Sequence, residues 1–302
     1  MVFNDKKDID YDVVPVKEYD GMGANIIKMM LNSIFEPGSM VRLHENIPEN
    51  IRNQIPIFKS IKDYLRILER EGEITLTKIG NLPPKYVKEI YENNEIKEYL
   101  IEEEGYTLRT ELDSRGVELT RILAGLCKYT KIRKNKLSLT KAGKDILKDE
   151  AEMFKKVIQV FTMGYNWGYL DGHEHNVRLS EIVSYNYYLI GKYGETREEY
   201  AFYLDKLLEA FPMALEIVVG ESEYETKKKF GRINFLRTFQ RYMEYMGLVT
   251  CNEKWGNEKL KKTELFDKVI DLSAIDSMKR YNKREVRKNH LEDVVAKLNY
   301  KK

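Results

Sequence analysis

The chain has 302 residues, of which 42% are hydrophobic and 33% charged, and its formal net charge at pH 7 is +2. This length supports two or three small domains with a core each, and the composition excludes a disordered protein. No apolar run approaches the ~20 residues that span a bilayer, and the N-terminus lacks the pattern of a secretory signal. Cys127 and Cys251 lie far apart in apolar segments, which predicts buried thiols in a reducing compartment. We therefore expect a soluble cytoplasmic protein without a membrane partner.

Charge is unevenly distributed along the chain. The net charge is −6 over residues 1–104, +4 over 105–152, −3 over 153–220 and +7 over 221–302. Two basic segments separated by an acidic one can mark a surface for an anionic partner. Mixed charges on solvated faces are the alternative explanation.

The first regular elements are helices and one short strand. A polar, irregular start contains one predicted helix from Asn25 to Ile34. Apolar residues at helical spacing predict a second helix that begins near Pro56 and ends at Gly72. An alternating strand over residues 74–79 follows, and prolines at 83 and 84 open a third helix.

The strand of this first unit recurs. Ile74-x-Leu76-Thr77-Lys78-x-Gly80 matches Leu137-x-Leu139-Thr140-Lys141-x-Gly143 at every fixed position, and Leu260-Lys261-Lys262-Thr263 begins a third copy. Thr77, Thr140 and Thr263 are each predicted to cap the following helix by accepting a backbone N–H. A helix with aligned apolar residues precedes the strands of each copy, and the spacing of the copies is too uneven for a solenoid. The pattern predicts separate winged-helix-like modules.

The segment between the second and third copies differs. Apolar and aromatic residues predict a helix from Phe154 to Leu170, a second that Gly191 and Gly194 end, and a third that ends at Pro212. The tyrosines of this block are Tyr185, Tyr187, Tyr188, Tyr193, Tyr200 and Tyr203. At helical spacing such rings favour a core over a surface that stacks nucleobases.

This middle block carries a resemblance to a known family. Tyr165-Asn166-Trp167-x-Tyr169-Leu170-Asp171, Tyr187-Tyr188-Leu189-Ile190-x-Lys192-Tyr193-Gly194 and the segment from Tyr203 to Pro212 resemble the uncharacterised bacterial plasmid ORF-three-like proteins. Leu76-Thr77-x-x-Gly80-Asn81-Leu82 is similar to a further signature of that family, and the resemblance covers roughly residues 55 to 272. Members often carry a SEC-C zinc motif, which this chain lacks. The family implies a bacterial protein and a fold, and it brings no established reaction.

We therefore predict a mainly α fold in which winged-helix-like modules, each a helix with a short β-hairpin, flank a block of helical hairpins. The predicted units are an irregular N-terminal segment (1–55), a wingless helix–strand–helix unit (56–104), a winged-helix-like domain (105–152), the helical hairpin block (153–220), a second winged-helix-like domain (221–272) and a basic C-terminal helix (273–302).

Basic side chains around the second and third copies suggest binding of nucleic acid. In winged-helix proteins the helix before the hairpin enters the major groove and the hairpin contacts phosphates. The residues predicted to bind DNA are Arg121, Lys128, Lys131, Arg133, Lys134, Lys136, Arg237 and Arg241. The alternative is that lysines keep an exposed edge strand soluble. A helix-turn-helix also needs a well-formed helix before the recognition helix, and residues 107–113 are short for that role.

One segment, Asp171-Gly172-His173-Glu174-His175, has side chains that bind metals. A strand would bring both imidazoles to one cation, but Gly172 favours a solvated loop. The sequence contains no glycine-rich phosphate loop and no nucleophile motif. We expect no catalytic residues, no metal and no cofactor. The leading hypothesis is a non-enzymatic DNA-binding protein with duplex DNA as its partner, and the alternative is a scaffold that binds another protein.

Overall fold

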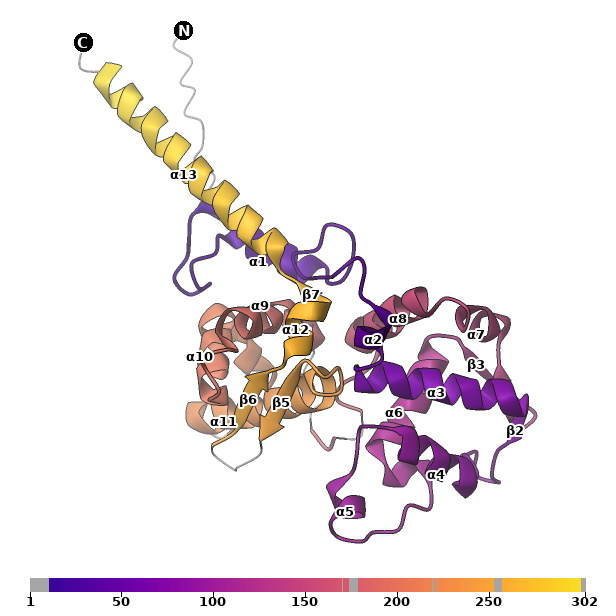
Figure 1. Ribbon diagram of the computed structural model, residues 1–302. Coiled ribbons are helices and arrows are strands. Elements are labelled where there is room, and N and C mark those ends of the chain that lie inside the picture. Colours follow the sequence, from indigo (N-terminus) through magenta and orange to yellow (C-terminus); the bar gives the residue numbers. More distant parts are fainter. Residues whose placement is uncertain are drawn as a thin grey trace.

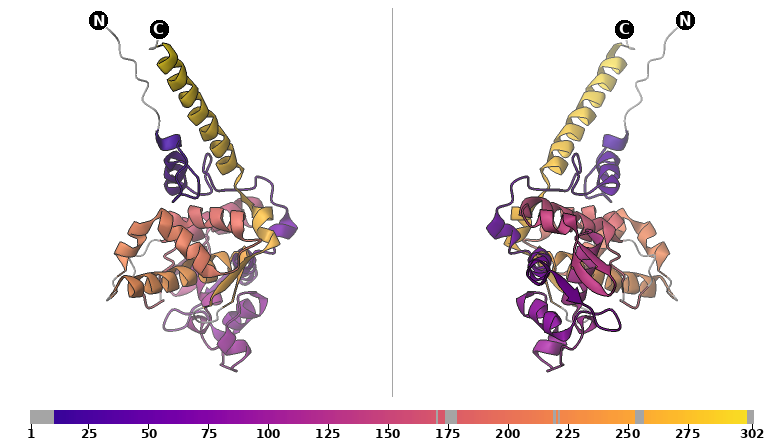
Figure 2. Two further views of the ribbon diagram at one scale, coloured as in Figure 1. Left: turned by 90° about the vertical axis from the view of Figure 1, so that its left-hand side faces the viewer. Right: turned by 90° about the vertical axis from the view of Figure 1, so that its right-hand side faces the viewer.

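A computed structural model of the chain describes residues 11–299, except 170, 174–178, 219, 221 and 253–256. Within these residues the protein is mainly helical with small antiparallel sheets, which confirms the predicted fold class. Two lobes lie side by side, and the long helix α13 (Ser273–Asn299) projects from the body (Figures 1 and 2). No described helix has both the length and the apolar character that crossing a bilayer requires.

The first lobe, which we call module one, spans residues 56–146. Its elements are α3 (Pro56–Glu71), β2 (Glu73–Thr75), α4 (Pro84–Asn93), α5 (Tyr99–Glu102), the 3-10 turn η2 (Glu111–Asp113), α6 (Arg115–Leu126), β3 (Thr130–Arg133), β4 (Lys136–Leu139) and α7 (Lys141–Ile146). The strand order is β2-β4-β3, so the strand after α3 pairs with the second strand of the hairpin. Lys134 and Asn135 join the hairpin strands with φ of 50° and 58°, as a two-residue type I′ turn requires.

Module two spans residues 183–269. Its elements are α9 (Val183–Tyr193), α10 (Tyr200–Ala210), α11 (Glu223–Asn234), the π-helix η6 (Phe235–Met243), β5 (Val249–Asn252), β6 (Lys259–Lys262) and α12 (Glu264–Val269). Glu199 forms an antiparallel bridge with Lys259, and Leu260 N donates to the Glu198 carbonyl at 2.8 Å. The segment after α9 therefore pairs with the second hairpin strand, as β2 does in module one.

Hydrogen bonds at the base of each hairpin align the two modules residue by residue. Tyr129 N donates to the Ala124 carbonyl, and Leu248 N donates to that of Met243. Thr140 N bonds the Tyr129 carbonyl at 2.9 Å, and Thr263 N bonds that of Leu248 at 3.0 Å. Residues 123–129 thus correspond to residues 242–248.

The structure corrects the predicted units, because it contains two copies of one topology where the sequence suggested three. Residues 56–104 and 105–152, predicted as separate units, contribute strands to one sheet through the pairing of β2 with β4. The predicted block 153–220 is divided, since α9 and α10 belong to module two. Thr77 caps no helix, because its hydroxyl accepts from Asn81 N at 3.0 Å and closes a turn.

The glycines of the middle block also differ from their predicted role. Gly191 lies within α9, where a Cβ would stand 2.3 Å from Leu272 Cδ1. It therefore permits close packing and does not end the helix. Gly194, which follows Tyr193, does end it.

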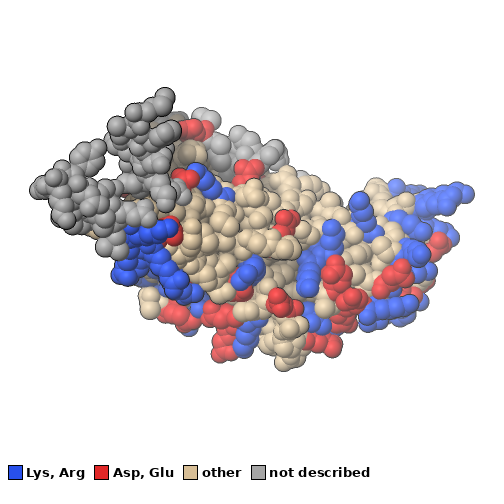
Figure 3. Space-filling model, turned by 90° about the horizontal axis from the view of Figure 1, so that it is seen from above, with Lys and Arg blue, Asp and Glu red and all other residues tan. Residues whose placement is uncertain are grey.

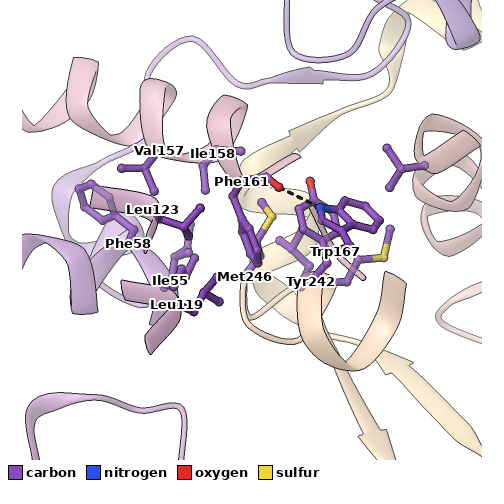
Figure 4. Close-up of a cluster of buried hydrophobic side chains, with 14 of the residues drawn as sticks. Ile55, Phe58, Leu119, Leu123, Val157, Ile158, Phe161, Trp167, Tyr242 and Met246 are labelled. Carbon is purple, nitrogen blue, oxygen red and sulfur yellow. Dashed lines mark hydrogen bonds between the residues drawn. The ribbon is translucent and has the colours of Figure 1, made fainter. Parts of the chain in front are cut away.

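A continuous apolar core joins the two modules. The connecting helix α8 (Glu150–Gln159) passes into a π-helical turn, η3 (Val160–Gly164), so the helix predicted to reach Leu170 ends earlier. Figure 4 shows side chains from α3, α6, α8, η3 and η6 meeting at this junction. There Trp167 stacks on Tyr242 with ring centroids 4.1 Å apart, and the Tyr242 hydroxyl bonds those of Thr162 and Tyr187 at 2.5 and 2.9 Å.

The N-terminal segment closes the fold over module two. It contains η1 (Tyr11–Val13), α1 (Ala24–Asn32), β1 (Arg42–Leu43) and α2 (Glu49–Arg52), and β1 pairs with β7 (Ile270–Asp271). The 3-10 turns η4 (Leu179–Ile182) and η5 (Pro212–Ile217) complete the described elements. Five of the six tyrosines of the middle block are buried and Tyr193 is partly buried, which confirms their predicted role in the core.

Candidate nucleic-acid interface

The eight predicted DNA-binding residues separate into an internal group and an exposed group. Arg237 is fully buried and forms a two-pronged ion pair with Asp171, at 2.5 Å from Nε to Oδ2 and 3.0 Å from Nη2 to Oδ1. Burial alone would raise the pKa of Asp171, but hydrogen bonds from Arg237 and His173 N hold it below its ordinary value. A Cβ on Gly168 would stand 2.7 Å from Arg237 Nη2, so a glycine is needed there. Arg237 is inaccessible to a nucleic acid.

Arg121 is also engaged within the protein. Its guanidinium bonds the Glu111 carboxylate and, at 2.9 Å, the Gly80 carbonyl, and only 16% of its side chain is exposed. Arg121 and Arg237 do not hold equivalent places either. Tyr129 corresponds to Leu248, and the residue eight positions before each is Arg121 in module one and Gln240 in module two. The expected pair of base-reading arginines is therefore not present.

Arg241 lies in the crevice where the two modules meet. Arg115, Leu119, Tyr165, Trp167 and Tyr245 line this crevice with it. Burial, together with the nearby Arg115 cation, lowers the pKa of Arg241. Arg241 therefore faces module one and not an outer surface.

The remaining five residues, on the β3–β4 hairpin and its base, are exposed as predicted. Lys128, Lys131, Arg133 and Lys134 form no ion pair with any described residue, whereas Lys136 pairs with Glu73 at 2.9 Å. Ile132 pairs with buried Leu137 and shares its inner side of the sheet. Because side chains alternate along a strand, Lys131 and Arg133 point to the outer side.

Five further cations extend this surface beyond the hairpin. Lys141 and Lys144 lie one turn apart on one face of α7, and Lys148 lies in the turn that follows the helix. Thr140 attaches α7 to the base of β3, because its hydroxyl donates to the Lys128 carbonyl at 2.8 Å. A Cβ on Gly143 would stand 2.1 Å from the Tyr129 carbonyl oxygen, which shows how closely α7 approaches. We call the exposed set without a described ion pair the lysine-rich face: Lys128, Lys131, Arg133, Lys134, Lys141, Lys144, Lys148, Lys155 and Lys156.

The lysine-rich face has a marked excess of positive charge. Residues 128–156 contain ten basic and four acidic side chains, a net charge of +6. One of the acids, Glu150, is neutralised by Lys62 from α3 at 2.9 Å. Figure 3 shows blue side chains gathered at the end of the molecule that carries α7, with red side chains between them. The basic cluster that the sequence indicates continues through Lys141, Lys144 and Lys148, but no sequence signal pointed to Lys155 and Lys156 on α8.

In the segment that could bind a metal, residues 171–175, Asp171 forms the ion pair with Arg237. Glu174 and His175 lie outside the described residues. Among the residues that the structure describes, no three metal-binding side chains cluster. A hollow of about 670 Å³ lies beside β1 and α12, where Arg42 and Asp271 pair with each other at 2.6 Å.

Comparison of the chain with family models, curated proteins and solved structures finds no match. The resemblance to the plasmid ORF-three-like proteins therefore stays a prediction. The function proposed below depends on the geometry of the chain alone.

Proposed function

We propose that the two modules are tandem winged helices and that the protein binds the phosphate backbone of nucleic acids through its lysine-rich face, without catalysis. Both modules share an order of helix, extended segment paired with the second hairpin strand, further helices and hairpin, which supports the winged-helix assignment. The observation that carries the binding proposal is the set of nine exposed cations without a described ion pair on the β3–β4 hairpin and in the segment from α7 to α8.

The internal arginines restrict the mode of binding. Arg237 is buried, Arg121 is held by Glu111, and Arg241 faces module one. The helices that would read base edges in a winged helix therefore offer none of these three arginines to the major groove. Contacts with phosphates position a protein on a duplex but carry no sequence information. We accordingly propose binding with little preference for sequence.

A salt titration of duplex binding tests this proposal. The triple variant Lys131→Glu, Arg133→Glu, Lys134→Glu should weaken binding by roughly tenfold or more. The slope of log affinity against log salt concentration should become shallower by about 0.9 for each phosphate that the variant no longer neutralises. The matched control is Lys283→Glu, Arg284→Glu, Lys288→Glu, which reverses three exposed cations on α13.

Unrelated duplexes of equal length should bind wild type with affinities within a few-fold of each other. Equal decreases in affinity in the two triple variants, or no binding of wild type at low salt, would contradict the proposal. Strong preference for one duplex sequence would contradict the assigned mode of binding.

A second candidate, a scaffold for protein–protein interaction, is favoured by a separate observation. The helix before each hairpin contributes to the buried junction: Leu119 and Leu123 of α6 lie in the same cluster as Tyr242 of η6, with Phe161 and Met246 between them (Figure 4). The end of α6, in contrast, exposes Leu126, and the segments beside it expose Ile79, Leu112 and Ile132. An apolar surface of this kind suits a protein partner better than a nucleic acid.

A further inference from the structure

The end of α6 and three segments beside it expose large apolar side chains: the turn after β2, η2 and β3. Ile79 is 78% exposed, Leu112 61%, Ile132 57% and Leu126 44%, and Ile122 is partly buried between them in sequence on α6. We call these five residues the α6 face. Apolar residues scattered singly over a surface are ordinary, but a contiguous patch marks a site of association.

Hydrogen bonds hold the segments that carry Ile79 and Leu112 beside α6. Arg121 of α6 binds both the Gly80 carbonyl, next to Ile79, and the Glu111 carboxylate, next to Leu112. Asn135 at the hairpin tip donates to the Leu76 carbonyl at 2.9 Å, which ties the turn that bears Ile79 to the hairpin.

The other edge of the α6 face is set by Gly125. Its missing side chain would point toward Thr130 Oγ1, 4.0 Å away, on the inner side of β3. Ile132, two residues further on, shares that inner side. Gly125 of α6 therefore lies beside the inner side of the hairpin, where Ile132 is exposed.

In module two, the residues equivalent to the end of α6 contact module one. Leu126 and Gly125 correspond to Tyr245 and Glu244. The Tyr245 carbonyl accepts from Ile57 N of module one at 3.0 Å, and Tyr245 lines the crevice between the modules. This surface is thus a contact surface in one module, and in the other the described residues leave it exposed.

Another segment of module one exposes both apolar side chains and carboxylates. Tyr99 is 67% exposed, Tyr106 65% and Leu100 53%, and three consecutive glutamates, 102–104, lie between them in sequence. We call residues 99–106 the α5 segment. Its carboxylates match the cations at the rim of the α6 face, Lys78 and Lys128, both of which are exposed.

We propose that the α6 face binds the α5 segment of a second copy of this chain. Apolar side chains of one copy cover those of the other, and glutamates 103 and 104 lie opposite Lys78 and Lys128. One such contact is small beside the ~1,600 Å² that a typical specific interface buries. The association is therefore reciprocal, a two-fold dimer in which each copy supplies both surfaces.

Sedimentation of the full chain over a range of concentrations tests the dimer. Wild type should dimerise reversibly, and the variants Leu126→Ser, Ile132→Ser and Tyr99→Ser, Leu100→Ser should each weaken the dimer roughly tenfold or more, as removal of central apolar contacts does. The control Met213→Ser, Tyr224→Ser removes side chains that are 63% and 70% exposed in module two, and it should leave the dimer unchanged. Thermal unfolding of each variant at low concentration should match wild type, since all these residues are exposed.

A charge exchange identifies the pairing. Glu103→Lys, Glu104→Lys should weaken self-association, and so should Lys78→Glu, Lys128→Glu, because each places like charges opposite each other. Mixing the two variants should restore a dimer, since both contacts of the mixed pair again join opposite charges. A monomer at all concentrations, equal effects in the control, or no dimer in the mixture would overturn the proposal. Sedimentation without nucleic acid measures the dimer, and the Lys131→Glu, Arg133→Glu, Lys134→Glu variant measures duplex binding, so failure of either proposal is seen separately.

Discussion

Modules one and two share a topology but differ in where their charges lie. In the hairpin of module two, Lys262 is only 8% exposed and bonds Asp267 at 2.6 Å and Glu195 at 3.0 Å. In the hairpin of module one, Lys131 and Arg133 are exposed and have no ion-pair partner among the described residues.

The contrast extends to the helix before each hairpin. η6 carries a fully buried arginine, Arg237, and is covered by module one, whereas the outer side of α6 is exposed. The difference teaches that one topology can place its charged side chains either inside the protein or on its surface. Under our proposals module one supplies the binding surfaces, and the helix before the hairpin of module two stays internal.

The largest expected effect comes from the buried ion pair of module two. Arg237→Met should lower the free energy of unfolding by about 3–5 kcal/mol, because it leaves the Asp171 carboxylate buried without its cation. Urea unfolding followed by circular dichroism measures the decrease. Adding Asp171→Asn should recover part of it, since the second change removes the stranded charge.

Arg121→Met in module one is the matched comparison. Glu111 would keep a backbone donor, Leu82 N at 3.3 Å, and Arg121 is partly exposed, so the decrease in stability should be about half that of Arg237→Met. Equal decreases would show that the two arginines are equally internal and would remove this part of the contrast between the modules.

An intermediate effect is expected where the N-terminal segment binds module two. Asp20 accepts hydrogen bonds from Tyr188, Lys192 and Tyr193 at 2.8, 2.5 and 2.8 Å. Burial opposes its ionisation, but these donors hold its pKa below the ordinary 3.8. Asp20→Asn should therefore cost about 2 kcal/mol near pH 7.

The pH dependence has a defined sign. Since the folded pKa of Asp20 lies below the unfolded one, its contribution is complete above about pH 4 and is lost as the pH falls through the folded pKa. Denaturant titrations of wild type and Asp20→Asn should converge in that acidic range. A constant difference down to the lowest pH would assign the stabilisation to another group.

Much of the local structure could be predicted from the sequence, because it depends on neighbours in the chain. The start of α3 at Pro56, its end at Gly72 and the cap at Thr140 follow from local rules for proline, glycine and hydroxyl side chains. The exposure of the hairpin lysines also followed, since a charged edge strand stays in water.

The grouping of elements into modules could not be predicted, because it depends on long-range pairing. Nothing local to Ile74 shows that it pairs with Leu137, and Thr77 resembles Thr140 in sequence while closing a turn. The burial of Arg237 depends on Asp171 from a distant loop and on the π-helical turns of η6, which change the face that each residue of the helix presents. A helical wheel drawn at 3.6 residues per turn therefore misplaces it.

The smallest expected effect compares the two equivalent threonines. Thr140 accepts from Gly143 N at 2.9 Å and donates to the Lys128 carbonyl, whereas Thr263 donates to the Gly247 carbonyl at 2.6 Å and makes no capping bond to α12. Thr140→Ala should therefore cost about 1 kcal/mol or slightly more, and Thr263→Ala about half of that. Urea midpoints resolve the difference if both variants keep the wild-type slope. Thr140→Ser and Thr263→Ser, which keep the hydroxyl, are the controls. A larger decrease for Thr263→Ala than for Thr140→Ala would contradict this. It would mean that the bond of Thr263 at the hairpin base of module two stabilises the protein more than the helix cap of Thr140 does.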